Sequence, residues 1–287
     1  MAYFILALSV LFMGAQSVIG AQYNRLNEGR RGTAAMYNLL LLSGAVCVYA
    51  VSSCIQFEFH AQTLWFSLGF GACFALTQCG FILALKRGPV ALTSLMMQLS
   101  LIGTVIYGFI FWDEKATAIS VVGLVLVVIS LVLCLCGQKK GGKANWAWFG
   151  FAMLMFLGNA GCSIVQKSQQ LAYDGNYKNM FMLFAMIFSL LITAVMFFVG
   201  DKTDAVAILR KSWFYPVLTG ILNALMNLFV MIMANLLPSS VVYPVISVGG
   251  LILTALASLL LFKEKLRPAQ WAGMGLGCVS VILLAVF

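Results

Sequence analysis

The chain has 287 residues, of which 63% are apolar and only 9% carry a charge. Soluble domains carry about 25% charged residues, so this composition excludes a soluble globular protein and predicts a membrane protein with several spans. The net charge of +9 comes from basic residues placed between apolar runs, which favours a role in membrane topology over nucleic-acid binding.

Ten apolar segments follow one another along the chain with short connections. Each is about 20 residues long, the length at which a helix crosses a bilayer. The predicted spans are residues 2–23, 33–53, 63–85, 89–112, 117–136, 146–166, 179–200, 213–235, 239–262 and 268–287. We assign residues 1–137 to a first half, 138–145 to a cytoplasmic linker rich in lysine and glycine, and 146–287 to a second half.

One stretch of the sequence occurs twice, at an offset of 150 residues. Each copy is an apolar helix, a short charged break and another apolar helix, with Glu114 in the first break matching Glu264 in the second. The first spans of the two halves match at an offset of 144, as Gln22 does with Gln166. Because five spans are an odd number, matching helices cross the membrane in opposite directions. The sequence therefore predicts an all-α membrane protein with ten transmembrane helices in two inverted-topology five-helix repeats.

The basic residues of the connections fall mostly on one side of this arrangement. Fourteen of the 17 lie on the side that we call the basic end: Arg25, Arg30, Arg31, Lys86, Arg87, Lys139, Lys140, Lys143, Lys202, Arg210, Lys211, Lys263, Lys265 and Arg267. Only Lys115, Lys167 and Lys178 lie toward the opposite end. Because positive residues remain in the cytoplasm, this bias predicts a multi-pass protein of the cell membrane with both termini outside the cytoplasm.

The motifs around the two glutamates resemble those of a known transporter family. In the second copy they run from Ser239 to Pro244, from Phe262 to Lys265 and from Gln270 to Gly273; in the weaker first copy they are Gly88 to Ala91, Asp113 to Lys115 and Gly123. Over its whole length the chain resembles the drug/metabolite transporter superfamily in its ten-helix EamA-like form. The resemblance implies export or exchange of small metabolites. Members are usually described with cytoplasmic termini, the reverse of what the charge bias predicts.

Uncharged polar side chains lie inside the predicted spans, whereas the charged residues lie at or near span ends. The candidates for a substrate site are Gln16, Thr77, Gln78, Gln98, Tyr107, Asn159, Asn223, Asn227, Tyr243 and Ser247. A buried amide is costly in lipid unless it finds a partner. Two accounts stay open: the amides join helices, at about 0.6 kcal/mol per hydrogen bond, or they line a polar cavity. We expect at least two of them to face a cavity.

Two further sets of residues are candidates for a hinge and for helix-dipole or gating roles. Pro244, with Gly249 and Gly250 after it, predicts a hinge in the ninth span, because proline frees a backbone carbonyl of the helix. Glu114 and Glu264 lie where one span ends and the next begins. We expect each to complement the dipole of a helix N-terminus, with gating or ion coupling as the alternative role.

The predicted function is secondary transport of a small neutral or zwitterionic metabolite, such as an amino acid or a nucleobase, by alternating access, as an exporter or facilitator. A nucleotide-sugar or sugar-phosphate exchanger is the alternative. It would need a basic side chain in the cavity, and the nearest one, Lys167, is expected to extend to the membrane interface instead.

Enzymatic activity is not expected, because His60 is the sole histidine and the cysteines do not cluster; a lipid-modifying membrane enzyme is the weaker alternative. We expect no cofactor, no metal and no nucleic acid. The expected partners are the substrate and the bilayer, with the chain as monomer or homodimer.

Overall fold

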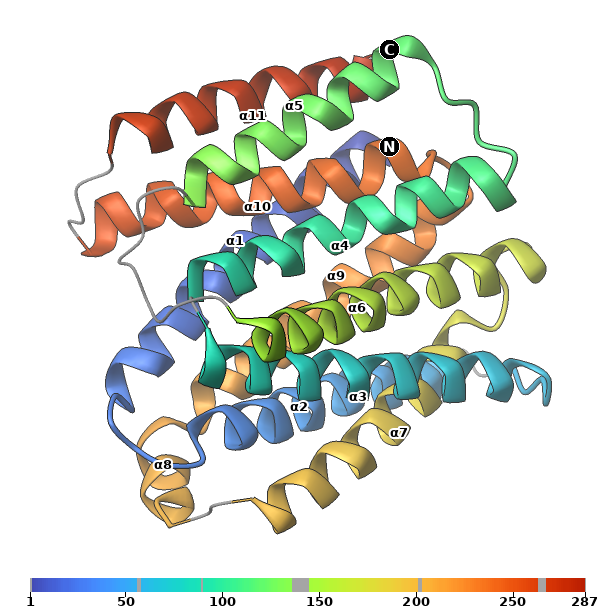
Figure 1. Ribbon diagram of the computed structural model, residues 1–287. Helices are drawn as coiled ribbons and strands as arrows, with labels where there is room; N and C mark the ends of the chain where they lie inside the picture. The colour runs from blue at the N-terminus through green and yellow to red at the C-terminus, as the bar shows by residue number, and fades with distance from the viewer. Residues whose placement is uncertain are drawn as a thin grey trace.

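A computed structural model of the chain describes residues 2–55, 58–88, 90–135, 145–200, 203–262 and 267–286. These residues form eleven α-helices and no strands (Figure 1). The helices are α1 (Ala2–Leu26), α2 (Thr33–Ile55), α3 (Thr63–Arg87), α4 (Val90–Phe111), α5 (Ala118–Leu135), α6 (Trp146–Ala172), α7 (Lys178–Val199), α8 (Ala205–Ser212), α9 (Phe214–Ala234), α10 (Ser239–Phe262) and α11 (Pro268–Val286). Glu264 and most of the predicted linker, residues 138–144, lie outside the described residues.

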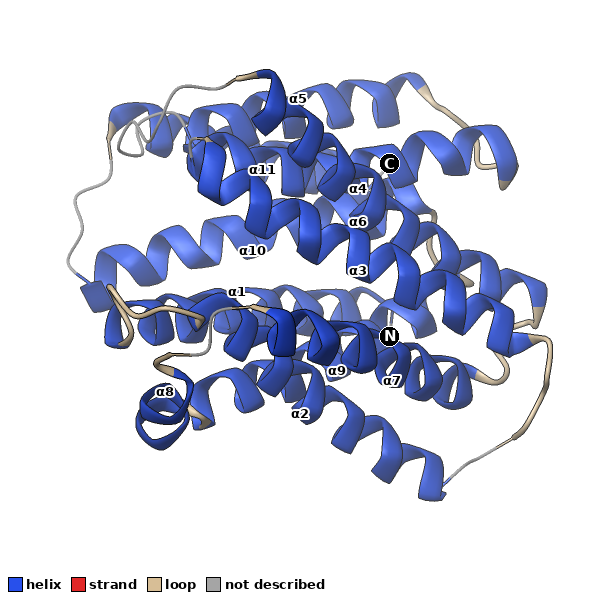
Figure 2. Cartoon of the chain, turned by 60° about the horizontal axis from the view of Figure 1, so that its bottom comes forward, coloured by secondary structure: helices blue, strands red, loops and turns tan. Residues whose placement is uncertain are grey.

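The expected all-helical membrane protein is confirmed, whereas the count of ten transmembrane helices is not. Eight of the described helices are long and apolar enough to cross a membrane. In α5 and α11 the apolar stretches, Ala118–Leu133 and Pro268–Leu284, are shorter. The additional helix, α8, has only eight residues and ends on Arg210 and Lys211. It forms in the connection between residues 200 and 213, where the sequence pattern predicted no helix. Figure 2 shows it end-on, across the direction of the other helices.

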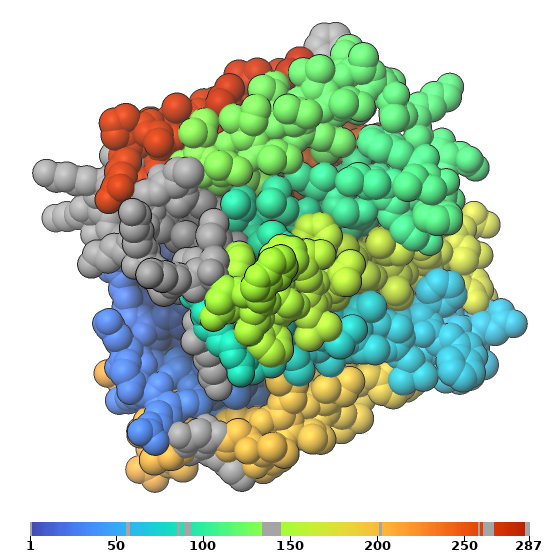
Figure 3. All heavy atoms as spheres, viewed as in Figure 1, coloured from blue at the N-terminus to red at the C-terminus, as the bar shows by residue number. Residues whose placement is uncertain are grey.

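Eight of the long helices form a closed ring of contacts. In order around the ring they are α7, α2, α9, α1, α10, α4, α6 and α3, and α3 packs again on α7. Every contact in this ring joins a helix before residue 137 to a helix after residue 145. The remaining pair, α5 and α11, packs together and covers α4 and α10, and Figure 3 shows these two helices side by side along one edge.

Glycines allow two of the ring crossings to be very close. At the crossing of α2 and α9, a Cβ atom on Gly44 would lie 2.6 Å from the carbonyl oxygen of Val217, and one on Gly220 would overlap the carbonyl of Leu41. At the crossing of α3 and α6, a Cβ atom on Gly158 would meet the backbone of α3 at 2.7 Å. Small residues serve this purpose in membrane proteins, because they let helix backbones approach each other.

The residues of the predicted hinge lie in α10, which continues as one helix through Pro244. Gly249 and Gly250 face α1: a Cβ atom on Gly249 would lie 2.7 Å from Val10, and one on Gly250 would overlap Met13. These glycines are therefore points of close packing between α10 and α1. The hinge itself stays a prediction.

Candidate functional site

A chain of four amide side chains crosses the interior from α1 through α9 to α6. Asn223 Nδ2 donates to Gln16 Oε1 at 3.1 Å, and Asn227 Nδ2 donates to Asn223 Oδ1 at 3.0 Å. At the far side, Gln166 Nε2 donates to Asn227 Oδ1 at 3.3 Å. Gln16 and Gln166 are buried and the two asparagines are partly exposed. Asn223 and Asn227 share a helix face because they are four residues apart, as the sequence predicted.

Two further polar contacts involve α4. Ser247 in α10 donates its hydroxyl to Gln98 Oε1 at 3.3 Å. Asn159 in α6 donates its Nδ2 to the hydroxyl of Ser100 at 2.6 Å and to the carbonyl of Met97 at 3.5 Å. These amides join helices to one another, which is one of the two roles open for them.

The other predicted site residues make local contacts. The hydroxyl of Thr77 donates to the backbone carbonyl four residues earlier in α3, where Gly158 packs against it. Tyr243 is buried, and its hydroxyl donates to the backbone carbonyl of Ser163 in α6 at 3.2 Å. Tyr107 stacks on Phe111, with 4.4 Å between the ring centroids. Thr77 thus lies in the contact of α3 with α6, and Tyr243 links α10 to α6 by one hydrogen bond.

A cavity of about 530 Å³ lies at the basic end between α2, α3 and α7. Its mouth includes Arg30, from the turn before α2, and Gly200, which follows α7. In its wall, Asn38 Nδ2 donates to Gln78 Oε1 at 2.8 Å. Thr193 lines it from the buried face of α7, and its hydroxyl has no hydrogen-bond partner among the described residues. The volume falls in the range of about 300–1,000 Å³ that is typical of sites for small organic ligands.

A buried ion pair lies at the opposite end. Lys167 in α6 is only 4% exposed, and its ammonium contacts the carboxylate of Glu114, which follows α4. The expectation that Lys167 extends to the membrane interface is therefore wrong. Helix α6 continues to Ala172, beyond the predicted end at residue 166, and this places Lys167 inside the bundle. Glu114 also accepts hydrogen bonds from the backbone N–H of Ser239 at 2.9 and 3.0 Å, which places its carboxylate at the N-terminus of α10, a helix much later in the chain.

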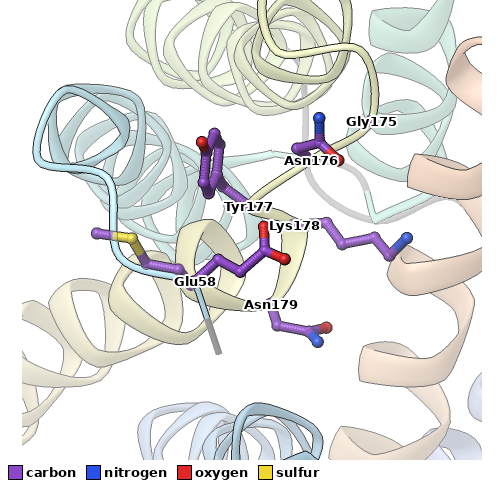
Figure 4. A pocket seen from close by; sticks show the side chains of 7 residues that line it. Glu58, Gly175, Asn176, Tyr177, Lys178 and Asn179 are labelled. Carbon is purple, nitrogen blue, oxygen red and sulfur yellow. The ribbon is translucent and has the colours of Figure 1, made fainter. Parts of the chain in front are cut away.

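Figure 4 shows a small pocket beside the start of α7 at the same end, with the Glu58 carboxylate directed toward Tyr177 and Lys178. Its volume of about 40 Å³ is far below that of an organic ligand site. Next to it the ring of His60 stacks against Tyr177 and meets the edge of Tyr173, with centroid distances of 4.9 and 5.0 Å. These rings tie the connection before α3 to the one between α6 and α7, and we assign the pocket no ligand.

Some residues of these polar groups were missed by the sequence pattern. Gln166 lay at the edge of a predicted span, although its repeat match to Gln22 marked it as an amide inside a helix. Asn38 lies well inside the second span and was an equally valid candidate. The buried hydroxyl of Thr193 carried no signal, because threonine is common in membrane helices that do not bind ligands.

Comparisons with known proteins place the chain among transporters. The model of a family described as "Sugar transport protein" matches residues 8–287. The match agrees with the expected membrane transporter but does not reach the EamA-like family in particular. A search of curated proteins gives no match. A solved structure titled "Crystal structure of protein" superposes with a TM-score of 0.79 at 13% identity, covering 98% of this chain and 95% of that one, which shows a shared fold.

Proposed function

Since the chain belongs to the sugar transport protein family, whose model matches residues 8–287, we propose that it carries a neutral sugar across the membrane by alternating access. That it is a membrane transporter follows from the family and from the apolar helices. A neutral sugar is one kind of the small neutral or zwitterionic metabolite that the sequence analysis expected as the substrate. The basic end faces the cytoplasm in this proposal, so that both termini lie outside it.

The chain of amides formed by Gln16, Asn223, Asn227 and Gln166 is the observation that carries the proposal. Each hydroxyl of a sugar both donates and accepts hydrogen bonds. An amide side chain offers two donors and one acceptor oxygen, so a row of amides can exchange its internal bonds for bonds to such hydroxyls. None of the four side chains carries a charge, which matches an uncharged solute. The cavity at the basic end supplies space beside further amides, Asn38 and Gln78.

Many alternating-access transporters are built from two halves of matched design, and the pattern of helix contacts supports such a design. If α1 to α5 match α6, α7, α9, α10 and α11 in order, the contacts occur in matched sets. The contact of α3 with α6 matches that of α9 with α1, and the contact of α4 with α6 matches that of α10 with α1. The pairs α2–α7, α4–α10 and α5–α11 each match themselves. This pattern is expected for inverted repeats around a two-fold axis in the membrane plane.

A sugar phosphate is the second candidate, because Arg30 lines the mouth of the cavity. Its guanidinium also donates to Asn27 Oδ1 at 3.1 Å, so an arriving phosphate would have to share it. Among the described residues that line the cavity, only Arg30 is basic. The side chains of Gln16, Asn223, Asn227 and Gln166 are uncharged, which makes the neutral sugar the stronger candidate.

Uptake by purified protein in proteoliposomes tests the proposal. We expect accumulation of a labelled neutral monosaccharide, competition by other neutral sugars, and no competition by sugar phosphates or amino acids. Asn223→Ala should reduce uptake at least tenfold, since it interrupts the amide chain at its centre. The matched control Asn24→Ala removes an exposed amide near the end of α1 and should leave uptake unchanged.

Two results would contradict this assignment. Uptake of a sugar phosphate in place of the neutral sugar would transfer the function to the second candidate. Wild-type uptake by Asn223→Ala would remove the amide chain from the substrate site, whatever the substrate is.

A further inference from the structure

The ion pair of Lys167 and Glu114 joins three helices at the end opposite the cavity, and we propose that it is the latch of the gate at that end of the transport path. The inference rests on the alternating access proposed above. Lys167 belongs to α6, Glu114 follows α4, and its carboxylate also binds Ser239 at the start of α10. One cluster therefore holds together the ends of α4, α6 and α10.

The geometry of the latch leaves its charged groups little contact with water. The side chains of Lys167 and Glu114 are 5% and 10% exposed. The ammonium lies 5.0 Å from the centroid of the Trp112 ring, a cation–π arrangement that covers it from one side. The carboxylate accepts two bonds from the backbone N–H of Ser239 and one from its hydroxyl. The ammonium thus keeps both of its partners only while α6 stays beside the end of α4, and the carboxylate keeps Ser239 only while α10 stays there too.

A pair of this kind suits a two-state contact. A buried ion pair contributes little net stability compared with apolar side chains of similar volume, because both charges lose their hydration. Once the helix ends separate, water replaces the lost partners and the desolvation cost disappears. The pair can therefore open if the end becomes hydrated, whereas partial separation without water is strongly unfavourable. This makes the closed and open states discrete.

Not all residue types of the latch are repeated in the sequence of the basic end. By the repeat offsets, Glu264 is the counterpart of Glu114, but Tyr23 stands where Lys167 would be and Pro89 where Ser239 would be. Tyr23 has no positive charge to offer, and its hydroxyl donates to the carbonyl of Thr33 at 3.1 Å. The described cavity lies at the basic end, opposite the latch.

Thiol labelling tests the latch without reference to the substrate. A cysteine is introduced with Ser163→Cys, one helical turn deeper than Lys167 in α6, where the serine is 9% exposed. A membrane-impermeant maleimide is added to right-side-out and to inside-out vesicles. The same protein without Ser163→Cys measures the background labelling of the native cysteines, which is subtracted. In Glu114→Gln and Lys167→Met, each of which leaves one charge buried without its partner, we expect labelling from the latched end to rise about tenfold, equivalent to about 1.4 kcal/mol in the opening equilibrium. The double variant removes both charges and should return labelling toward the wild-type rate.

A matched control neutralises the residues on either side of Glu114. Asp113→Asn with Lys115→Met removes one charge of each sign from exposed positions and should leave the labelling rate unchanged. Labelling that stays at the wild-type rate in both single variants, or that rises only from the basic end, overturns the proposal. If the single variants do not fold, Glu114→Asp decides instead: its shorter side chain should give a smaller rise in the same direction, and an unchanged rate overturns the latch. Failure of sugar uptake with a positive labelling result would reject the substrate and keep the gate.

Discussion

At the scale of single residues, Glu114 is the counterion of Lys167 within the bundle. Glu114→Gln leaves an ammonium without its counterion in a site that is 4% exposed, and we expect a loss of about 3–5 kcal/mol in the free energy of unfolding. The double variant Glu114→Gln with Lys167→Met removes both charges and should recover most of that loss. Thermal unfolding of the purified proteins in lipid nanodiscs measures both. A double variant as unstable as the single one would mean that the pair itself supplies net stability.

The polar residues of the interior show which features the sequence could predict and which it could not. Asn223 and Asn227 were predicted to share a face because the helix period fixes that relation, and they lie in one hydrogen-bonded chain. Lys167 was misplaced because the polar residues after it resemble the end of a span. In the structure Gln169 and Gln170 are fully buried and the side chain of Gln170 donates to that of Gln169, so the helix continues through them. The hydropathy of a segment does not show which residues from distant parts of the chain will bind its polar side chains, as Glu114 binds Lys167.

At the scale of helices, the crossing of α2 and α9 depends on glycine. Gly220→Ala places a methyl group against the backbone carbonyl of Leu41, which cannot rotate away as a side chain can. We expect a destabilisation of about 1–3 kcal/mol, the cost of overpacking a fitted contact. Gly150→Ala is the matched control in α6, because nothing lies within 4 Å of its Cβ position, and alanine there should be neutral or slightly stabilising. Equal unfolding midpoints for the two variants would refute the close crossing.

Most helices were predictable because a span must bury its backbone polar groups in its own hydrogen bonds, and apolar length alone then marks it. The helix α8 was not, since its eight residues lie among Lys and Arg in a connection. The crossings were also not predictable. The glycines could be counted, but the sequence does not state that Gly44 meets Val217, a contact between two helices far apart in the chain.

At the scale of the whole molecule, the sequence repeat indicates two related halves but not how they combine. In the structure the halves alternate around the ring, so that each of its eight contacts joins one half to the other. The pair α5 and α11 likewise takes one helix from each half. The core cluster around Leu42, Phe70 and Phe181 is built from both halves as well. A half therefore has few of its packing partners within itself.

This alternation predicts that neither half folds alone. Residues 1–137 and 146–287, expressed separately in the membrane, should each be degraded or extractable only in aggregated form. Expressed together, they should copurify as one complex with the unfolding midpoint and transport activity of the chain, lowered by the loss of the covalent link. The control is the continuous chain with a protease site inserted in the linker and left uncleaved, which measures the effect of the insertion alone. A monodisperse first half with cooperative unfolding would contradict the prediction, because it would require a core that the contacts of the ring do not provide.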